Sequence, residues 1–240
     1  KDLAEVARKY GIIVLSDEIY GQLRFDGHHV SIARFYPEGT IVSSGISKWC
    51  GAGGWRLGTF TCPPDLSWLV DAMAAIASET YTSVCAPIQY AAIQAFHGGS
   101  EIEHYLSHAR RILAALGSRS AAILNEAGIR VKPPKGAFYL FLDFTQHADK
   151  LAARSIRGSS ELCDQLLEET GVAILPGAAF GRSRAELTAR LSYVDFDGAA
   201  ALTASENTPL DQPLPPEFLD HYCSNVIQGV SRIAEWVHRR

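Results

Sequence analysis

Short apolar runs alternate with helical stripes of apolar residues along the chain. A helical spacing over Lys1–Tyr10 is followed by Gly11, a residue that commonly ends helices, and then by the apolar run Ile12–Leu15. A short β-branched run of this kind is typical of a strand that is buried on both faces, as in parallel sheets. Repeated alternation of helix and strand predicts an α/β fold with a mostly parallel sheet.

The same alternation predicts the other elements of the first hundred residues. They are strands at Thr40–Ser44 and Trp55–Cys62, a helix from Pro63 to about Ser78, and a helix over Pro87–Phe96. A longer helical stripe covers Ser100–Ala127 and ends at Gly128. We place a domain boundary at this long helix, so that residues 1–100 belong to a large domain. Residues 101–240 then form a smaller α+β domain that is entered through the helix.

The sequence after the long helix predicts shorter elements and more turns than the first hundred residues. We expect strands at Ile129–Val131, Ala137–Phe144, Val172–Leu175 and Ala189–Val194, and a helix at Ser160–Thr170. Four prolines between residues 209 and 216 indicate an extended connector over about 197–216. One closing helix should begin near Glu217 and turn Phe218, Tyr222, Val226, Val230, Ile233 and Val237 inward.

Composition narrows the functional classes. The chain has 22 Lys+Arg and 26 Asp+Glu, a net charge of −4, and 47% hydrophobic residues, which excludes a disordered chain and disfavours a nucleic-acid partner. The five cysteines are odd in number and show no CxxC spacing, which argues against a disulfide framework or a structural zinc site and fits a reducing cytoplasm. No apolar stretch reaches the length of a membrane helix.

Two side chains near the first strand are candidates for chemistry. Asp17 follows the run Ile12–Leu15, at the carboxyl end of the predicted strand, where α/β sheets bind ligands. Tyr20 lies three residues further on. The alternative is that Asp17 only caps the next helix.

A lysine and an arginine stand in a segment rich in glycine and serine. Lys48 ends the sequence Ser43-Ser44-Gly45-Ile46-Ser47-Lys48, and Arg56 follows the glycines of Gly51–Gly54. Glycine permits close backbone approach to a ligand, and hydroxyls and arginine can bind phosphate. A solvated lysine and a flexible loop are the competing interpretations, and the segment lacks the pattern of a nucleotide P-loop.

Two further features concern the second part. Arg190 lies in a predicted apolar strand, where its charge needs a carboxylate, supplied either by an internal Asp or Glu or by a ligand. His104 and His108 have the i, i+4 spacing of metal ligands, but no third ligand is evident. We therefore expect no metal site, with these histidines on a solvated helix face.

Six motifs occur in one order along the chain. They are Ser16-Asp17-Glu18-Ile19-Tyr20, Ser44-Gly45-Ile46-Ser47-Lys48, Gly54-Trp55-Arg56-Leu57-Gly58, Gly136-Ala137-Phe138-Tyr139, Leu175-Pro176-Gly177-Ala178-Ala179-Phe180-Gly181 and Arg190-Leu191-Ser192. In this combination the sequence resembles the class I/II aminotransferases, which are fold-type I pyridoxal-phosphate enzymes. The resemblance extends from Lys1 to about Tyr193 and again through the last helix.

The resemblance implies a role for each candidate residue. Lys48 would form the internal aldimine with pyridoxal 5'-phosphate, Asp17 would pair with the ring nitrogen, and Tyr20 would hydrogen-bond the ring oxygen. Arg56 would bind the phosphate, with Ser44 or Ser47 as its hydroxyl partner. Arg190 would hold the substrate α-carboxylate. The implied reaction is amino transfer between an L-amino acid and a 2-oxo acid.

The chain also departs from the family pattern. Many relatives have Ser where this chain has Gly45, which leaves the choice between Ser44 and Ser47 open, and the connector at 197–216 is unusually rich in proline. The chain opens with Lys1 inside a helical pattern, and complete members are far longer. We therefore expect it to be the C-terminal portion of a homodimeric, cytoplasmic enzyme.

Three alternatives keep the resemblance and change the function. One is a pyridoxal-phosphate lyase, of the C–S β-lyase or cyclopropane-carboxylate synthase type, which would share the same site residues. A second is the aminotransferase-like effector domain of a winged-helix transcription regulator. A third is a truncated and inactive remnant.

Overall fold

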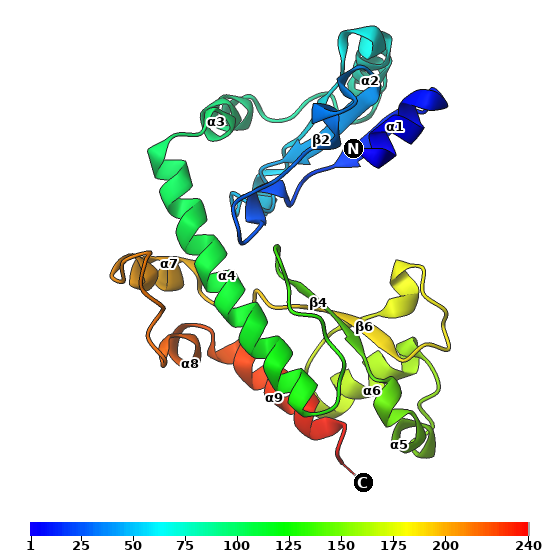
Figure 1. Ribbon diagram of the computed structural model, residues 1–240, viewed down its shortest axis with the longest axis vertical. Coiled ribbons are helices and arrows are strands. Elements are labelled where there is room, and N and C mark those ends of the chain that lie inside the picture. The colour runs from blue at the N-terminus through cyan, green and yellow to red at the C-terminus, as the bar shows by residue number, and fades with distance from the viewer. Residues whose placement is uncertain (240) are drawn as a thin grey trace. The chain divides into compact units, whose positions relative to one another are not determined.

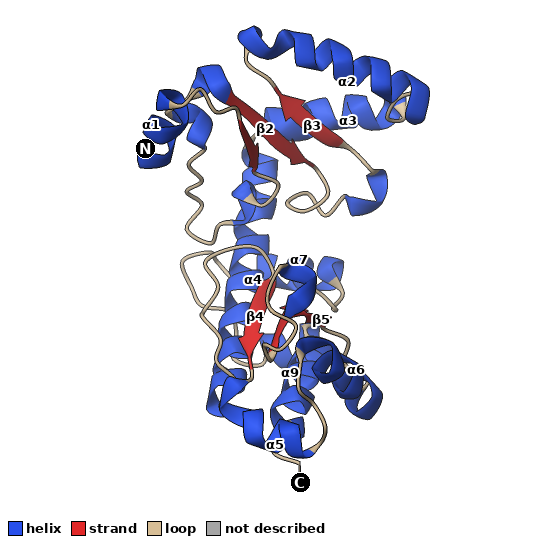
Figure 2. Ribbon diagram, turned by 90° about the vertical axis from the view of Figure 1, so that its right-hand side faces the viewer, coloured by secondary structure: helices blue, strands red, loops and turns tan. Residues whose placement is uncertain are grey.

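The computed structural model describes residues 1–239 and divides into two compact units. The first unit is Lys1–Leu106 and the second begins at Ser107, so the division falls inside the long helix α4 (Ser100–Glu126). Figures 1 and 2 show that each unit has its own small sheet and its own helices. Within residues 1–239, no helix combines the length and apolar character that crossing a bilayer requires.

The first unit is built on a three-stranded sheet in the order β1-β2-β3. Its elements are α1 (Asp2–Lys9), β1 (Val14–Asp17), β2 (Thr40–Gly45), β3 (Gly58–Thr61), α2 (Ser67–Thr80), α3 (Ala86–His97) and the start of α4. Strands β1 and β2 are parallel, whereas β3 runs antiparallel to β2. The α/β alternation is confirmed, but in this part of the chain only one of the two strand pairs is parallel.

Strand β1 begins two residues later than the hydrophobic pattern predicts. The amide of Ile12 donates to the carbonyl of Ala7 at 2.9 Å and completes the end of α1, so Ile12 belongs to the helix terminus. The ladder then runs from Val14, opposite Thr40, to Asp17, opposite Ser43. Asp17 is therefore the last residue of the strand and not a cap in the loop after it.

The two faces of this sheet have different surroundings. Ala4 and Ala7 of α1 are buried together with Tyr36 and contact Val14, so α1 covers the face to which Val14 points. Successive strand residues point to opposite faces. Leu15 therefore belongs to the other face, where it is 62% exposed.

Strand β3 is shorter than predicted because its first residues form a turn. A short 3-10 helix covers Gly53–Trp55, and Arg56 follows with a left-handed φ of 56°. This conformation is rare for a residue with a side chain, and it reverses the chain direction before the strand begins at Gly58.

The second unit contains a sheet in the order β4-β6-β5, in which both strand pairs are antiparallel. Its elements after α4 are β4 (Tyr139–Asp143), α5 (Ala148–Ala153), α6 (Ser159–Thr170), β5 (Leu175–Pro176), β6 (Thr188–Ser192), α7 (Gly198–Glu206), α8 (Phe218–Tyr222) and α9 (Ser224–Trp236). Helix α9 runs beside the later turns of α4 (Figure 1), and Val226, Val230 and Ile233 are buried on its inner side as predicted.

Ile129–Val131 was expected to be a strand but forms only one isolated bridge, between Arg130 and Asp143. The backbone groups of Val131 form hydrogen bonds with the side chain of Asn125 instead. It donates to the carbonyl of Val131 and accepts from its amide, both at 3.0 Å. Because these groups are used to close the end of α4, they are not available for a longer ladder.

Two predictions about the end of the chain are wrong. The connector contains helix α7, because Asp197 accepts a hydrogen bond from the Ala200 amide at 3.0 Å and caps a run rich in alanine. The closing helix is divided into α8 and α9 at Cys223, whose φ of −125° is not helical and whose side chain is fully buried.

Candidate functional site

Asp17 lies at the carboxyl end of β1 with its side chain exposed. Its only hydrogen bond comes from the amide of Ile19, at 3.3 Å, and within residues 1–239 no cation pairs with it. Ser43 is its partner in the parallel register, so the two side chains share one face of the sheet. The Asp17 carboxylate is therefore available to a ligand on that face.

Lys48 follows β2 by three residues and is half-buried. Its carbonyl accepts a hydrogen bond from the Gly51 amide, whereas its amine forms no ion pair or hydrogen bond with any described residue. Strands β1 and β2 are parallel, so Asp17 and the segment leading to Lys48 leave the sheet at the same edge. This edge is where open α/β sheets bind ligands.

The register separates the two candidate serines. Ser44 lines a cavity of about 250 Å³ together with Glu18 and Val42, on the face opposite to Asp17. Ser47 lies beyond the strand, next to Lys48, and is half-buried. The pairing of the strands therefore places Ser44 away from Asp17, whereas Ser47 lies beyond the ladder.

Arg56 stands at the end of the glycine-rich loop. Its guanidinium donates to the carbonyl of Gly53 at 3.0 Å, and its side chain is otherwise exposed. The loop itself folds back on the Lys48 segment, since the amide of Ala52 donates to the carbonyl of Ile46 at 3.2 Å. The sequence left a phosphate cradle and a flexible loop equally open, and these contacts show an ordered turn.

A carboxylate that sequence analysis did not single out lies beside Asp17. Glu18 accepts hydrogen bonds from His29 Nε2 at 2.6 Å and from Ser31 Oγ at 2.5 Å. Burial raises the pKa of the Glu18 carboxyl, but hydrogen bonds from Ser31, His29 and Ser16 outweigh this effect and hold the pKa below its ordinary value. The only signal in the sequence was the adjacent acidic pair at the strand end.

Tyr20 is half-buried and begins the turn after β1. Its carbonyl accepts a hydrogen bond from the amide of Leu23 at 2.9 Å, which fixes the short 3-10 helix Gly21–Leu23. The turn places Tyr20 at the same end of the strand as Asp17.

Arg190 lies in β6 of the second unit, half-buried between two aromatic rings. Its guanidinium carbon is 4.3 Å from the centroid of Tyr139 and 4.2 Å from that of Phe180. Within the described part of this unit no carboxylate pairs with it, so the internal partner considered from the sequence is absent. Rings that cover the flat faces of a guanidinium leave its N–H edge free for an acceptor.

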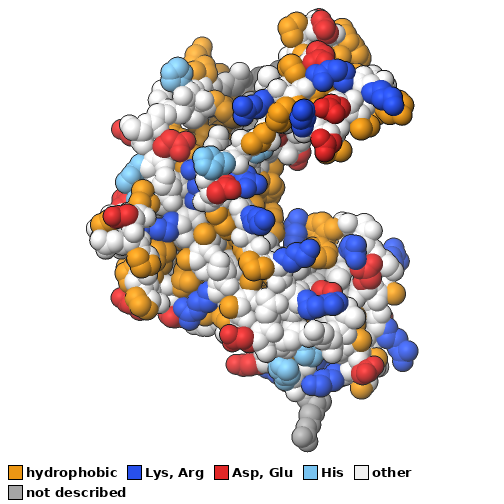
Figure 3. All heavy atoms as spheres, viewed as in Figure 1, with side chains coloured by type: hydrophobic (Ala, Val, Ile, Leu, Met, Phe, Trp, Pro, Cys, Tyr) orange, Lys and Arg blue, Asp and Glu red, His pale blue; other side chains and the backbone are white. Residues whose placement is uncertain are grey.

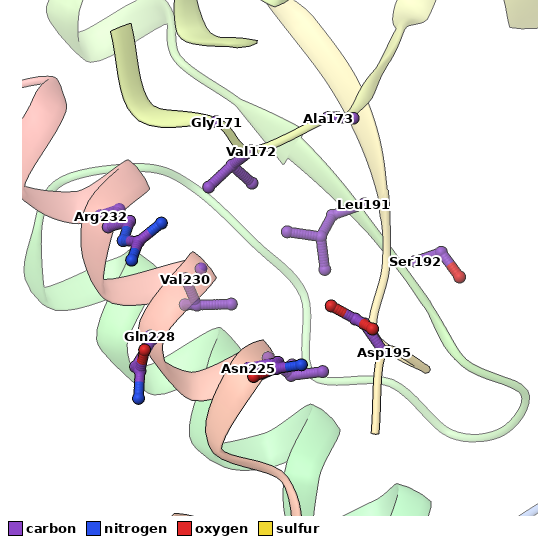
Figure 4. Close-up of a pocket in the computed structure, with 12 residues that line it drawn as sticks. Gly171, Val172, Ala173, Leu191, Ser192, Asp195, Asn225, Gln228, Val230 and Arg232 are labelled. Carbon is purple, nitrogen blue, oxygen red and sulfur yellow. The ribbon is translucent and has the colours of Figure 1, made fainter. Parts of the chain in front are cut away.

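A separate pocket of about 370 Å³ lies on the other face of β6, in the same unit. Figure 4 shows Val172, Leu191 and Val230 pointing into it, with Asp195 and Asn225 near one end. Leu191 neighbours Arg190 in the strand, and neighbouring strand residues point to opposite faces. The pocket therefore contains none of the predicted site residues.

The two histidines of the long helix were expected on its solvated face. His108 is 2% exposed, and its Nδ1 lies 2.9 Å from Ser205 Oγ, so the expectation of a solvated position is wrong for this residue. Among residues 1–239 no three His, Cys, Asp or Glu side chains are grouped as metal ligands would be.

The two units together have the fold of the fold-type I pyridoxal-phosphate transferases. This assignment rests on solved structures that superimpose on almost the whole chain. An aromatic aminotransferase from Pyrococcus horikoshii OT3 matches with a TM-score of 0.74 and 27% identity, over 98% of this chain and 54% of that one. An aspartate aminotransferase from Thermus thermophilus, determined with maleate, matches with a TM-score of 0.72 and 27% identity, over 97% and 50%.

Comparison of the amino-acid sequence with known families identifies the family of this chain. The family model described as aminotransferase class I and II matches residues 1–199, and the chain belongs to this family. It is 35% identical over 198 residues to an aspartate aminotransferase from Bacillus sp. (strain YM-2), covering 80% of this chain and 47% of that protein. It is 38% identical over 187 residues to a putative aminotransferase, YugH, from Bacillus subtilis, covering 76% and 44%. The chain thus spans about half the length of these relatives.

Proposed function

We propose that the gene product containing this chain is a pyridoxal-phosphate-dependent aminotransferase that moves an amino group between an L-amino acid and a 2-oxo acid. The observation that carries the proposal is the pairing of β1 and β2. It brings an exposed carboxylate, Asp17, and the amine of Lys48, which has no partner among residues 1–239, to one sheet edge. Family membership and the names of the matched relatives support the same reaction.

The donor set of the first unit fits this cofactor. Bound pyridoxal phosphate supplies an aldehyde that condenses with amines and a pyridine ring that accepts an electron pair from the substrate. A carboxylate, a free amine, a phenol and a guanidinium suit the ring nitrogen, the aldehyde, the ring oxygen and the phosphate respectively. Asp17, Lys48, Tyr20 and Arg56 provide these four groups.

In this proposal Lys48 transfers the substrate proton and Asp17 stabilises the proton on the cofactor ring. The Lys48 amine would hold the cofactor and would move the proton at the substrate Cα. The Asp17 carboxylate would favour a protonated ring nitrogen, because an ion pair there stabilises the charged form. Tyr20 donates a hydrogen bond to the ring oxygen.

Arg56 and Ser47 hold the phosphate. A guanidinium and a hydroxyl provide several donors to phosphate oxygens, and Arg56 has edges that the Gly53 carbonyl does not use. Ser44 contributes less in this proposal, because it faces the cavity lined by Glu18.

Arg190 binds the α-carboxylate of the amino acid or oxo acid. Its planar fork accommodates a carboxylate through two hydrogen bonds, and no internal carboxylate competes for it within the described part of its unit. Contacts with the Tyr139 and Phe180 rings limit the positions open to the guanidinium. The restriction lowers the entropy lost on binding.

We also propose a cytoplasmic homodimer. Hydrophobic side chains stand at the surface of the first unit around α2 (Figure 3), where Trp68, Ile76 and Tyr81 are each at least 60% exposed. Apolar surface of this kind is typical of protein interfaces.

An assay of the purified complete gene product with pyridoxal phosphate tests the reaction. We expect transfer of the amino group from an amino acid to added 2-oxo acid, with no turnover when the oxo acid is omitted. Release of pyruvate and ammonia without an oxo acid would show a lyase instead. If the protein binds the cofactor but catalyses neither reaction, the proposal is contradicted.

A further inference from the structure

The carboxylate of Glu18 is the centre of a hydrogen-bond cluster behind Asp17. His29 Nε2 and Ser31 Oγ approach its two oxygens at 2.6 and 2.5 Å, and Ser16 contributes a further hydrogen bond. The Glu18 side chain is only 11% exposed. These contacts tie the loop that carries His29 and Ser31 to the end of β1.

The cluster is tightly built around a glycine. A Cβ at Gly21 would lie 2.8 Å from Cδ2 of His29, so a side chain there would displace the imidazole from Glu18. Ser31 is fixed in turn, because its hydroxyl also accepts a hydrogen bond from the Ala33 amide at 3.1 Å. The donors to Glu18 are therefore held in place by the fold.

Glu18 is the first residue after β1 and is directly next to Asp17. Its side chain lines a cavity with Val42 and Ser44, whose strand register places them on the face opposite to Asp17. The amide of Glu18 donates to the carbonyl of Ser43 at 2.8 Å, so the peptide between the two acids is anchored to β2. Asp17 itself receives one long hydrogen bond, from Ile19. The direction of the Asp17 carboxylate therefore depends on how the backbone at the end of β1 is held, by the ladder and by the hydrogen bond of Glu18.

We propose that Glu18 is a positioning residue, whose anchorage by Ser16, His29 and Ser31 on one face of β1 sets the direction of the Asp17 carboxylate on the other face. This inference rests on the proposed function, because it assigns Asp17 to the cofactor ring. It implies that the site needs the anchored Glu18 side chain in addition to the residues that would contact the cofactor.

A double-mutant cycle tests this role in the complete gene product. The measured quantity is the pH midpoint at which the visible absorption of bound pyridoxal phosphate changes. We expect Glu18→Gln, which keeps the size and removes the charge, to shift this midpoint in the same direction as Asp17→Asn. It should lower kcat by up to about 10²-fold and leave KM for the amino acid unchanged.

The cycle distinguishes positioning from general destabilisation. In the Asp17→Asn background, Glu18→Gln should cause no further shift, because the carboxylate that it positions is gone. Glu168→Gln, an exposed change on α6 in the second unit, is the matched control and should leave the midpoint in place. Equal shifts by Glu18→Gln in both backgrounds, or no shift in either, would overturn the proposal.

Two further measurements cover the remaining outcomes. If Glu18→Gln does not fold, Ser31→Ala removes one donor while retaining Glu18, and a normal midpoint in that variant would also overturn the proposal. Amide hydrogen exchange of the cofactor-free protein should be faster around Glu18 in either variant. Failure of the unaltered protein to show any cofactor absorption would instead refute the proposed function, and the role of Glu18 with it.

Discussion

The guanidinium carbon of Arg190 lies 4.2 Å from the centroid of the Phe180 ring. The centroid of the Tyr139 ring lies 4.3 Å from the same carbon. In the described part of its unit no carboxylate pairs with this arginine. The aromatic rings attract its positive charge, and its N–H groups can still donate hydrogen bonds to an anion. The contact gives the proposed substrate-binding role a structural basis.

Arg190→Lys should raise KM for amino acids and oxo acids by about 10- to 100-fold, because lysine keeps the charge and loses the two-pronged hydrogen bond. Cofactor retention should be unaffected. Steady-state kinetics and a cofactor dissociation assay measure the two effects. Loss of the cofactor with normal substrate affinity would show that the roles of Arg190 and Arg56 have been exchanged.

Phe180 offers a matched pair of variants. Phe180→Leu removes the ring and should raise KM several-fold, in line with the roughly 0.5–2 kcal/mol of a cation–π contact. Phe180→Tyr retains the ring and should behave as the unaltered protein, since the side chain is 40% exposed and leaves room for the hydroxyl. Equal KM values for the two variants would mean that the stacking does not position Arg190.

Asp17→Asn should lower kcat by about 10²–10³-fold, because the neutral amide no longer stabilises a protonated ring. The substitution preserves the size of the side chain and can keep the hydrogen bond from Ile19. Rapid-mixing kinetics of the half-reaction with an amino acid would measure the effect. Near-normal turnover would indicate that Asp17 only terminates the strand.

His147 makes stability depend on pH in the second unit. Burial lowers its pKa below 6.5, and neighbouring His238 and Lys150 act in the same direction, while a hydrogen bond to the Ala127 carbonyl at 2.9 Å opposes them. The unfolded chain therefore binds the proton more readily. The contribution of His147 to stability is complete above pH 6.5 and is lost as the pH falls through its folded pKa.

Urea unfolding between about pH 5 and pH 8 measures this effect. His147→Gln keeps a donor for the Ala127 carbonyl and cannot titrate, so its free energy of unfolding should fall less steeply on acidification. The same slope in both proteins would assign the pH dependence to other groups.

Periodicity and motif order were sufficient for most of the elements of the first unit and for the family, but not for details that depend on register. The position of Ser44 on the face opposite to Asp17 is decided by the β1–β2 pairing, which no local pattern encodes. Helix α7 was not predicted, because the prolines after it indicated an extended connector. Asp197 and the alanine run that follows it are nevertheless signals for the start of a helix. The stacking of Arg190 depends on residues far apart in sequence, Tyr139 and Phe180.

Covalent capture of the cofactor tests the central claim most directly. The complete gene product would be incubated with pyridoxal phosphate, reduced with borohydride, digested and mapped by mass spectrometry, with Lys48→Ala as the control. We predict that the label is found on Lys48 and is absent from the variant, because the Lys48 amine has no competing partner among the described residues. A label on another lysine, such as Lys9 or Lys135, with Lys48 unmodified, would contradict the account.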